Sequence, residues 1–247
     1  MLGYPGCMNA YDNRAVTAIP DSSGGPLPPS FFARSAPEVA RDLLGKYIFS
    51  SVGGARAGGR IVETEAYLGP HDPGSHAATR AVTTRNAVMY AAPGTAYVYF
   101  TYGQHHMLNL VAEPEGTAGA VLIRAIEPTT GLQSIRLRRC GVSDQAFADG
   151  PGKVAEALGV TLDDNAVTLG AGRLEVLDGP VPAEPILVSG RVGLTEGHEL
   201  PLRFYLAGHP GVSRGRIGPP SPRKRSVSDR DAARDRLSND PNARRTP

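Results

Sequence analysis

Apolar residues recur with helical spacing in three segments of the chain. Residues 35–38 read Ser-Ala-Pro-Glu, a capping box with a proline in the first turn, and the apolar face that follows should end at Gly45. Two further helices are predicted over residues 132–139 and 151–158. The pattern therefore predicts three short helices.

Stretches rich in β-branched and aromatic residues predict most of the remaining elements as strands. Gly103 separates the stretches 97–102 and 108–112, so these should form a hairpin with its turn near residues 102–105. The elements lack regular β-α-β alternation, which favours an α+β domain on a mostly antiparallel sheet. The other predicted strands are 47–49, 60–68, 120–125, 174–177, 186–192 and 202–206.

Composition and charge divide the chain into a flexible leader (1–28), one folded domain (29–212) and a basic tail (213–247). Residues 214–247 hold ten basic and four acidic side chains, a net charge of +6, whereas the rest holds 16 basic and 20 acidic ones, a net charge of −4. The tail has too few apolar residues to bury a core, so we expect it to be disordered. It either adds non-specific attraction to phosphates or is a solvated extension.

Several classes of protein find no support in the sequence. No stretch approaches the roughly 18 apolar residues of a membrane span, so no membrane partner is expected. Cys7 and Cys140 are the only cysteines, and a reducing, cytoplasmic setting, nucleoid-associated if the protein is bacterial, is the plain interpretation. No histidine spacing matches a metal signature, so no metal site is expected. Residues 150–153 lack the features of a phosphate loop, although a helix start there can hold one phosphate.

The stretch 59–70 carries the most informative chemistry. In a strand, Glu63, Glu65 and Tyr67 point to one face, because alternate residues share a side. Two nearby carboxylates can divide the roles of acid and base, as in glycosidases. The alternative is a solvent-facing strand with ordinary acidic residues.

The predicted hairpin carries an aromatic cluster. Tyr97 and Tyr99 share one face, and Val98 and Phe100 should lie on the opposite, core-facing side. Tyr102 stands beside the turn glycine, where it can act as a wedge or a stacking platform for a base. The alternative is that it only covers the edge of the sheet.

Taken together, these residues resemble the alkyladenine (3-methyladenine) DNA glycosylase family. The resemblance runs in order from about residue 33 to residue 206. It implies a single α+β domain with a curved, mostly antiparallel sheet, flanking helices and a protruding hairpin that intercalates into DNA. Its pieces are the stretches 41–45, 59–70, 72–76, 84–90, 93–103, 108–110, 121–128, 150–153 and 201–205.

The resemblance implies a monomeric, monofunctional glycosylase that acts on double-stranded DNA containing damaged purines and uses no cofactor. Glu65 matches the general base that activates the attacking water, and Arg124 matches the arginine that holds this water and the adjacent phosphate. Tyr67, His76 and Tyr99 match the side chains that sandwich the extruded base. Asn109 matches the residue that clashes with the amino group of guanine.

The remaining matches concern DNA contacts. Tyr102 matches the hairpin tyrosine that fills the place of the extruded base, and we expect Gln104, Arg85 and Lys153 to contact DNA as well. Gln104 stands where relatives often carry methionine, so this hairpin should wedge less firmly. Glu63 is hypothesised to be structural.

Two alternatives stay open on the sequence alone. One is a damaged-DNA-binding module on the same fold without catalysis, which the presence of Glu65, Arg124 and Asn109 weighs against. The other is a metal-dependent hydrolase that uses the histidines. The absence of a candidate catalytic lysine fits hydrolysis by water rather than a Schiff base.

Overall fold

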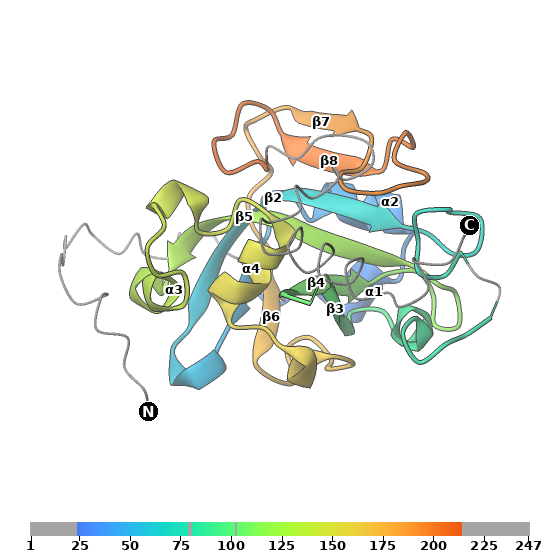
Figure 1. Cartoon of the computed structure of the whole chain (residues 1–247), viewed down its shortest axis with the longest axis horizontal. Helices are drawn as coiled ribbons and strands as arrows, with labels where there is room; N and C mark the ends of the chain where they lie inside the picture. Colours follow the sequence, from blue (N-terminus) through green and yellow to red (C-terminus); the bar gives the residue numbers. More distant parts are fainter. Residues whose placement is uncertain (1–23, 79–80, 102, 214–247) are drawn as a thin grey trace, which may run out of the picture.

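A long central strand, β2 (Ala57–Tyr67), organises the sheet of this protein (Figure 1). The computed structural model describes residues 24–78, 81–101 and 103–213. They form one domain with eight strands in a single curved antiparallel sheet. The other strands are β1 (Tyr47–Ser50), β3 (Ala96–Thr101), β4 (His105–Val111), β5 (Ala120–Thr130), β6 (Leu174–Leu177), β7 (Ile186–Ser189) and β8 (Arg203–Leu206).

The pairing of β2 explains why the sheet curves. β5 runs along most of β2, whereas on the other side β1 pairs with residues 57–60 and β8 pairs with residues 63–65. The β2–β5 register also shifts on both sides of Glu63. Because bulges bend a strand and increase its twist, we infer that the sheet changes direction at Glu63. The complete order is β3-β4-β5-β2-β1-β6, with β8 on the far half of β2 and β7 beyond it.

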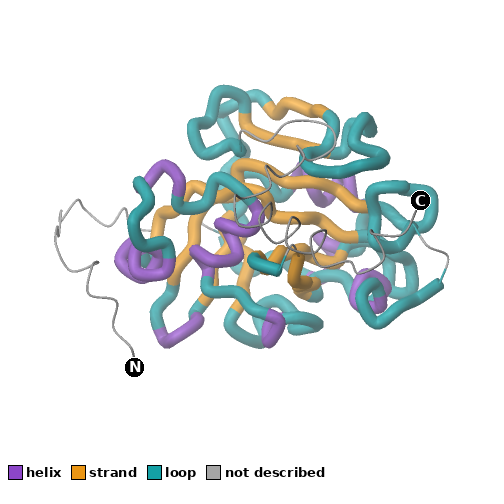
Figure 2. The backbone as a smooth tube through the Cα atoms, in the orientation of Figure 1, coloured by secondary structure: helices purple, strands orange, loops and turns teal. Residues whose placement is uncertain are grey.

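Short helices surround this sheet (Figure 2). Three of them pack on it: α2 contacts β2 and β5, α4 contacts β4 and β5, and α3 contacts β2. The side of β2 opposite the glutamates faces α2, where the Thr64 hydroxyl donates to the Ala40 carbonyl at 2.7 Å. The helices are α1 (Pro29–Phe32), α2 (Ala36–Asp42), α3 (Leu132–Arg138) and α4 (Pro151–Leu158), with short 3₁₀ turns η1 (Val52–Gly54), η2 (Ala87–Tyr90), η3 (Asp144–Ala146) and η4 (Leu162–Asp164).

The predicted elements are confirmed with small changes in their ends. α2, α3 and α4 lie where helices were predicted, and Gly45 follows α2 with a φ of +86°. The predicted strand 186–192 is shorter and ends at Ser189. The Ser35 hydroxyl bonds the Glu38 carboxylate instead of making the expected capping bond to the backbone.

The prediction for Phe100 was wrong. Val98 is buried as expected, but Phe100 is 45% exposed and lies against His106, with 5.0 Å between the ring centroids. The reason is that β5 pairs with β4 only at residues 109–111. The outer half of the β3–β4 hairpin therefore extends past the sheet, as the family resemblance implied, and has no core to face.

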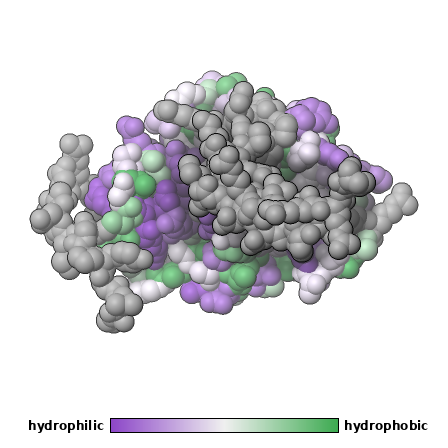
Figure 3. All heavy atoms as spheres, in the orientation of Figure 1, coloured by the Kyte–Doolittle hydropathy of each residue, from purple (hydrophilic) through white to green (hydrophobic). Residues whose placement is uncertain are grey.

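The surface of the described domain carries both polar and apolar residues. In the view of Figure 3, the described part of the surface mixes hydrophilic and hydrophobic residues. Among the described residues, no helix is both long enough and apolar enough to cross a membrane. The division into leader, domain and tail stays a prediction, but Leu27 already bonds to β6 and Ser213 is buried.

Candidate active site

Glu63 and Glu65 are both completely buried in the centre of the sheet. Alternation along β2 directs both carboxylates to Arg124 on the neighbouring strand β5. A solvent-facing strand with ordinary acidic residues is therefore not what the structure contains. Burying a charge is costly unless it is paired and hydrogen-bonded. Both carboxylates meet this condition, Glu65 with three hydrogen-bond donors and Glu63 with four.

Three donors hold the Glu65 carboxylate. The Val192 amide donates to Oε1 at 2.7 Å, while the Tyr67 hydroxyl and Arg124 Nη1 donate to Oε2 at 2.9 and 3.1 Å. A carboxylate has about four lone-pair sites, two on each oxygen. Oε2 is thus saturated, and Oε1 keeps one free site.

Glu63 instead accepts four hydrogen bonds. Arg124 Nε and Arg203 Nε donate to Oε1 at 2.8 and 2.6 Å, and Ser213 donates through its hydroxyl at 2.8 Å and its amide at 2.6 Å. Burial raises the pKa of the Glu63 carboxyl, but Arg124, Arg203 and Ser213 outweigh burial, so this pKa lies below its usual value. Burial lowers the pKa of Arg124, but Glu65 and Glu63 more than compensate, and that pKa lies above its usual value.

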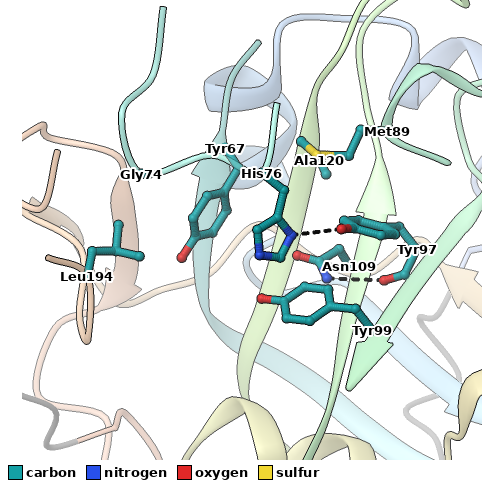
Figure 4. A pocket seen from close by; sticks show the side chains of 9 residues that line it. All are labelled: Tyr67, Gly74, His76, Met89, Tyr97, Tyr99, Asn109, Ala120 and Leu194. Carbon is teal, nitrogen blue, oxygen red and sulfur yellow. Dashed lines mark hydrogen bonds between the residues drawn. The ribbon is translucent and has the colours of Figure 1, made fainter. Parts of the chain in front are cut away.

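A pocket with aromatic walls lies beside Tyr67 (Figure 4). Tyr67 connects this pocket to Glu65, because its ring lines the pocket while its hydroxyl donates to Glu65. Figure 4 shows Tyr67 on the β2 side and His76, Tyr97 and Tyr99 gathered on the other side. The pocket is lined by Tyr67, Gly74, His76, Met89, Tyr97, Tyr99, Asn109, Ala120 and Leu194.

His76 lies between the tyrosines of β3 and the pocket. Its Nδ1 is 2.7 Å from the Tyr97 hydroxyl, and its ring meets Tyr99 edge-on at 4.6 Å between centroids. Burial, with a smaller contribution from Arg85, lowers the pKa of His76 to about 4. Burial raises the pKa of Tyr97 to about 12, against the opposing effect of Arg85. Both side chains are therefore neutral near pH 7.

This shift predicts how stability changes with pH. Below its ordinary pKa of 6.5, His76 takes up a proton in the unfolded chain, whereas in the folded protein it stays neutral to about pH 4. Acidification through this window therefore favours unfolding. In denaturant unfolding at several pH values, we expect His76→Gln to lose less stability between pH 6.5 and 4 than the wild type. Parallel losses would show that His76 is protonated in the folded state.

Asn109 reaches the same pocket from β4. It is 2% exposed, and its Nδ2 donates to the Tyr97 carbonyl at 3.1 Å on the paired strand. This bond fixes the plane of the amide at the pocket wall. Thus the structure brings together Glu65, Tyr67, His76, Tyr99, Asn109 and Arg124, all of which the sequence analysis proposed for one site.

The sequence analysis missed a buried ion pair that joins two walls of the site. Arg191 and Asp72 are both fully buried, with Arg191 Nη1 donating to Asp72 Oδ2 at 2.6 Å. Asp72 also accepts the amides of Leu68 and Gly74, so it shapes the loop that carries His76. The Arg191 guanidinium lies 4.7 Å from the centroid of the Tyr67 ring. The sequence did carry one signal for this ion pair, because Arg191 lies within the otherwise apolar strand predicted over residues 186–192.

The side chains expected to contact DNA lie at the rim. Tyr102 is outside the described residues. Gln104 is exposed at the hairpin turn, and exposed Arg85 lies 5.4 Å from the centroid of the Tyr99 ring. Lys153 is in the first turn of α4 and pairs with Asp149 at 2.7 Å. A side chain at Gly152 would come within 2.9 Å of His105 Cγ, so α4 begins directly against the hairpin.

No candidate metal centre is visible in the part of the chain that the structure describes, since no three His, Cys, Asp or Glu side chains are grouped to hold an ion. The histidines proposed for a metal-dependent hydrolase are dispersed. His76 bonds Tyr97, whereas His105 lies on the hairpin beside α4.

Comparison with known proteins identifies relatives over most of the chain. The model of the methylpurine-DNA glycosylase family matches residues 30–210. A relative from Chlorobium luteolum, named as a candidate 3-methyladenine DNA glycosylase, is 47% identical over 188 residues, which cover 75% of this chain and 95% of the relative. A protein from Salinibacter ruber with the same name is 46% identical over 200 residues, covering 76% of this chain and 96% of that protein.

These matches define the class of the protein as an enzyme that acts on DNA. The chain belongs to the methylpurine-DNA glycosylase family.

Proposed function

We propose that the protein is a monofunctional DNA glycosylase of base excision repair that hydrolyses the N-glycosidic bond of damaged purines in duplex DNA. Its substrates are alkylated or deaminated purines of the 3-methyladenine, 7-methylguanine, hypoxanthine and ethenoadenine class. The observation that carries the proposal is Tyr67, which lines the aromatic pocket with its ring and bonds the buried Glu65 carboxylate with its hydroxyl. We infer that a base held against this ring places its sugar on the side of Glu65.

Glu65 is suited to hold and deprotonate a water molecule. The free lone-pair site on Oε1 is the place for the water, because the Val192 amide takes the other site and Oε2 is saturated. Arg124 fixes the carboxylate and carries a positive charge for an adjacent phosphate. A positioned general base contributes roughly 10²- to 10⁴-fold to a reaction rate.

The pocket supports base flipping. A stacked base cannot be reached within a duplex, so it must be extruded at a cost of about a few kcal/mol, which is lower for a damaged or mispaired base. Purines alkylated at N3 or N7 are cationic and leave readily, and the electron-rich faces of Tyr67 and Tyr99 favour such a cation. Asn109 at the wall is positioned to exclude the amino group of guanine. We propose that Tyr102 fills the vacated position.

The proposal is tested with duplexes that each carry one hypoxanthine or ethenoadenine. Wild-type protein should produce abasic sites that break only after heating in alkali, and borohydride should trap no covalent complex, because water is the nucleophile. Breaks before alkali treatment, or a trapped complex, would show lyase chemistry instead.

The basic tail gives a further expected result. Its ten basic residues follow Ser213, the last described residue, which is bonded to Arg124. Deleting residues 214–247 should weaken binding to undamaged DNA and flatten its dependence on salt, by a slope of about 0.9 for each phosphate that the tail neutralises. Fluorescence anisotropy across a salt series measures this slope. If the dependence of DNA affinity on salt is unchanged by the deletion, the tail makes no contact with phosphates.

A further inference from the structure

Arg124 is held from three directions by groups that do not line the pocket. Its Nε donates to Glu63 at 2.8 Å, its Nη1 to Glu65 at 3.1 Å and its Nη2 to the Ser213 hydroxyl at 3.2 Å. Each nitrogen of the guanidinium therefore has one fixed partner. Since the guanidinium is planar and rigid, these partners define its orientation completely.

Ser213 closes this network from the end of the described chain. Its hydroxyl accepts from Arg124 and donates to Glu63, its amide donates to Glu63, and its carbonyl accepts from Arg203 Nη2 at 3.1 Å. Arg203 belongs to β8 and faces Glu65 in the strand register. The network thus joins β2, β5, β8 and residue 213 around one arginine.

The charges in this network balance, because Glu63 and Glu65 face Arg124 and Arg203. Glu63 accepts three of its hydrogen bonds on Oε1 and one, from the Ser213 amide, on Oε2. All four donors belong to residues that do not line the aromatic pocket, whereas Glu65 bonds the pocket residue Tyr67. The contact of Glu63 with the reaction therefore runs through Arg124.

From these contacts we propose that Glu63, Arg203 and Ser213 are positioning residues that fix the Arg124 guanidinium against Glu65. The inference rests on the proposed function, because it assigns these residues to the same reaction. It also places Ser213, which the sequence analysis assigned to the tail, in the machinery of the enzyme. Misplacing a reacting group by about 1 Å can cost on the order of 10²-fold in rate.

The test uses full-length Glu63→Gln, Ser213→Ala and Ser213→Thr. Single-turnover base release from an ethenoadenine duplex should fall about 10- to 100-fold in Glu63→Gln. Ser213→Ala should lose less, because the amide bond to Glu63 remains, and Ser213→Thr should restore much of the rate. The Kd for a duplex with a tetrahydrofuran abasic-site analogue should stay within about 3-fold, because the pocket and the hairpin are unchanged.

Asp164→Asn serves as the matched control for lost stability. Asp164 is also a buried carboxylate, bonded to Arg173 and to the Thr161 amide, but it lies in η4 outside the network. We expect it to lower the melting temperature without a comparable loss of rate. If Glu63→Gln and Asp164→Asn have equal melting temperatures and lose equal rate, Glu63 has a purely structural role and the proposal is overturned.

A double variant tests whether Glu63 acts on the reaction only through Arg124 and Glu65. If Glu63 acts only through Arg124 and Glu65, adding Glu63→Gln to Glu65→Gln should cause little further loss, since residues that act as a unit are strongly non-additive. Fully additive losses would contradict the proposal. If the wild type releases base and the Glu63 and Ser213 variants release it at the same rate, the positioning proposal is refuted and the proposed function stands. If the wild type releases no base, both the proposed function and the positioning proposal are refuted.

Discussion

Glu65→Gln should abolish most base release while leaving recognition of damaged DNA intact. The amide cannot take a proton from water, so the contribution of a general base, roughly 10²- to 10⁴-fold, is lost from the single-turnover rate. Lesion binding should persist, because His76, Tyr99 and Asn109 line the pocket and remain in the variant. The single-turnover rate and the Kd for a lesion duplex measure the two effects separately.

The Glu65 variant also disturbs packing, and this effect must be separated from catalysis. Three N–H or O–H groups point at the carboxylate, so one end of the amide must place its NH₂ against a donor. Melting temperatures establish how much stability is lost, and Glu184→Gln, at a carboxylate paired with Arg60, provides a control. A Glu65→Gln protein that releases base at the wild-type rate would show that another group activates the water.

Asp72→Ala should destabilise the protein by about 3–5 kcal/mol, because it leaves a buried charge without its partner. Arg191 is 0% exposed, and among the described residues its terminal nitrogens would keep hydrogen bonds only to the carbonyls of Ala66 and Gly197. The substitution also frees the loop that carries His76 from two of its backbone bonds. Denaturant unfolding measures the free energy directly.

An exposed ion pair provides the matched control for Asp72. Arg136 and Asp144 lie 2.6 Å apart, but their side chains are 42% and 62% exposed. Exposed pairs contribute about 0–1 kcal/mol, so Asp144→Ala should change the free energy of unfolding by no more than this. A similar, small loss in both variants would mean that the Asp72 site takes up water and that its pair is not energetically buried.

Local patterns predicted the parts of this fold that local chemistry determines. Ser35 and the proline in the first turn mark the start of α2, Gly45 follows its end, and Gly103 marks the hairpin, because helix ends and turns depend on a few adjacent residues. Alternation along β2 also placed Glu63, Glu65 and Tyr67 on one side correctly. The family resemblance contributed Arg124, His76 and Asn109, which no spacing rule connects to Glu65.

The features that sequence reasoning missed depend on distant partners. The predicted strand 186–192 ends at Ser189, and the Val192 amide beyond it donates to Glu65, 127 positions away. Ser213 looked like the start of a tail, yet it bonds Glu63 across 150 positions. Phe100 fits the alternation of a core residue, but that alternation does not show where the supporting strand β5 stops.

Single-turnover release of free base from methylated duplex DNA by the wild-type protein, with a chelator present, tests the proposed glycosylase activity itself. We expect free damaged purine in an amount equal to the abasic sites formed, with no dependence on metal. Lesion-dependent binding without any released base would contradict it and make the protein a damage-recognition module built on a glycosylase fold.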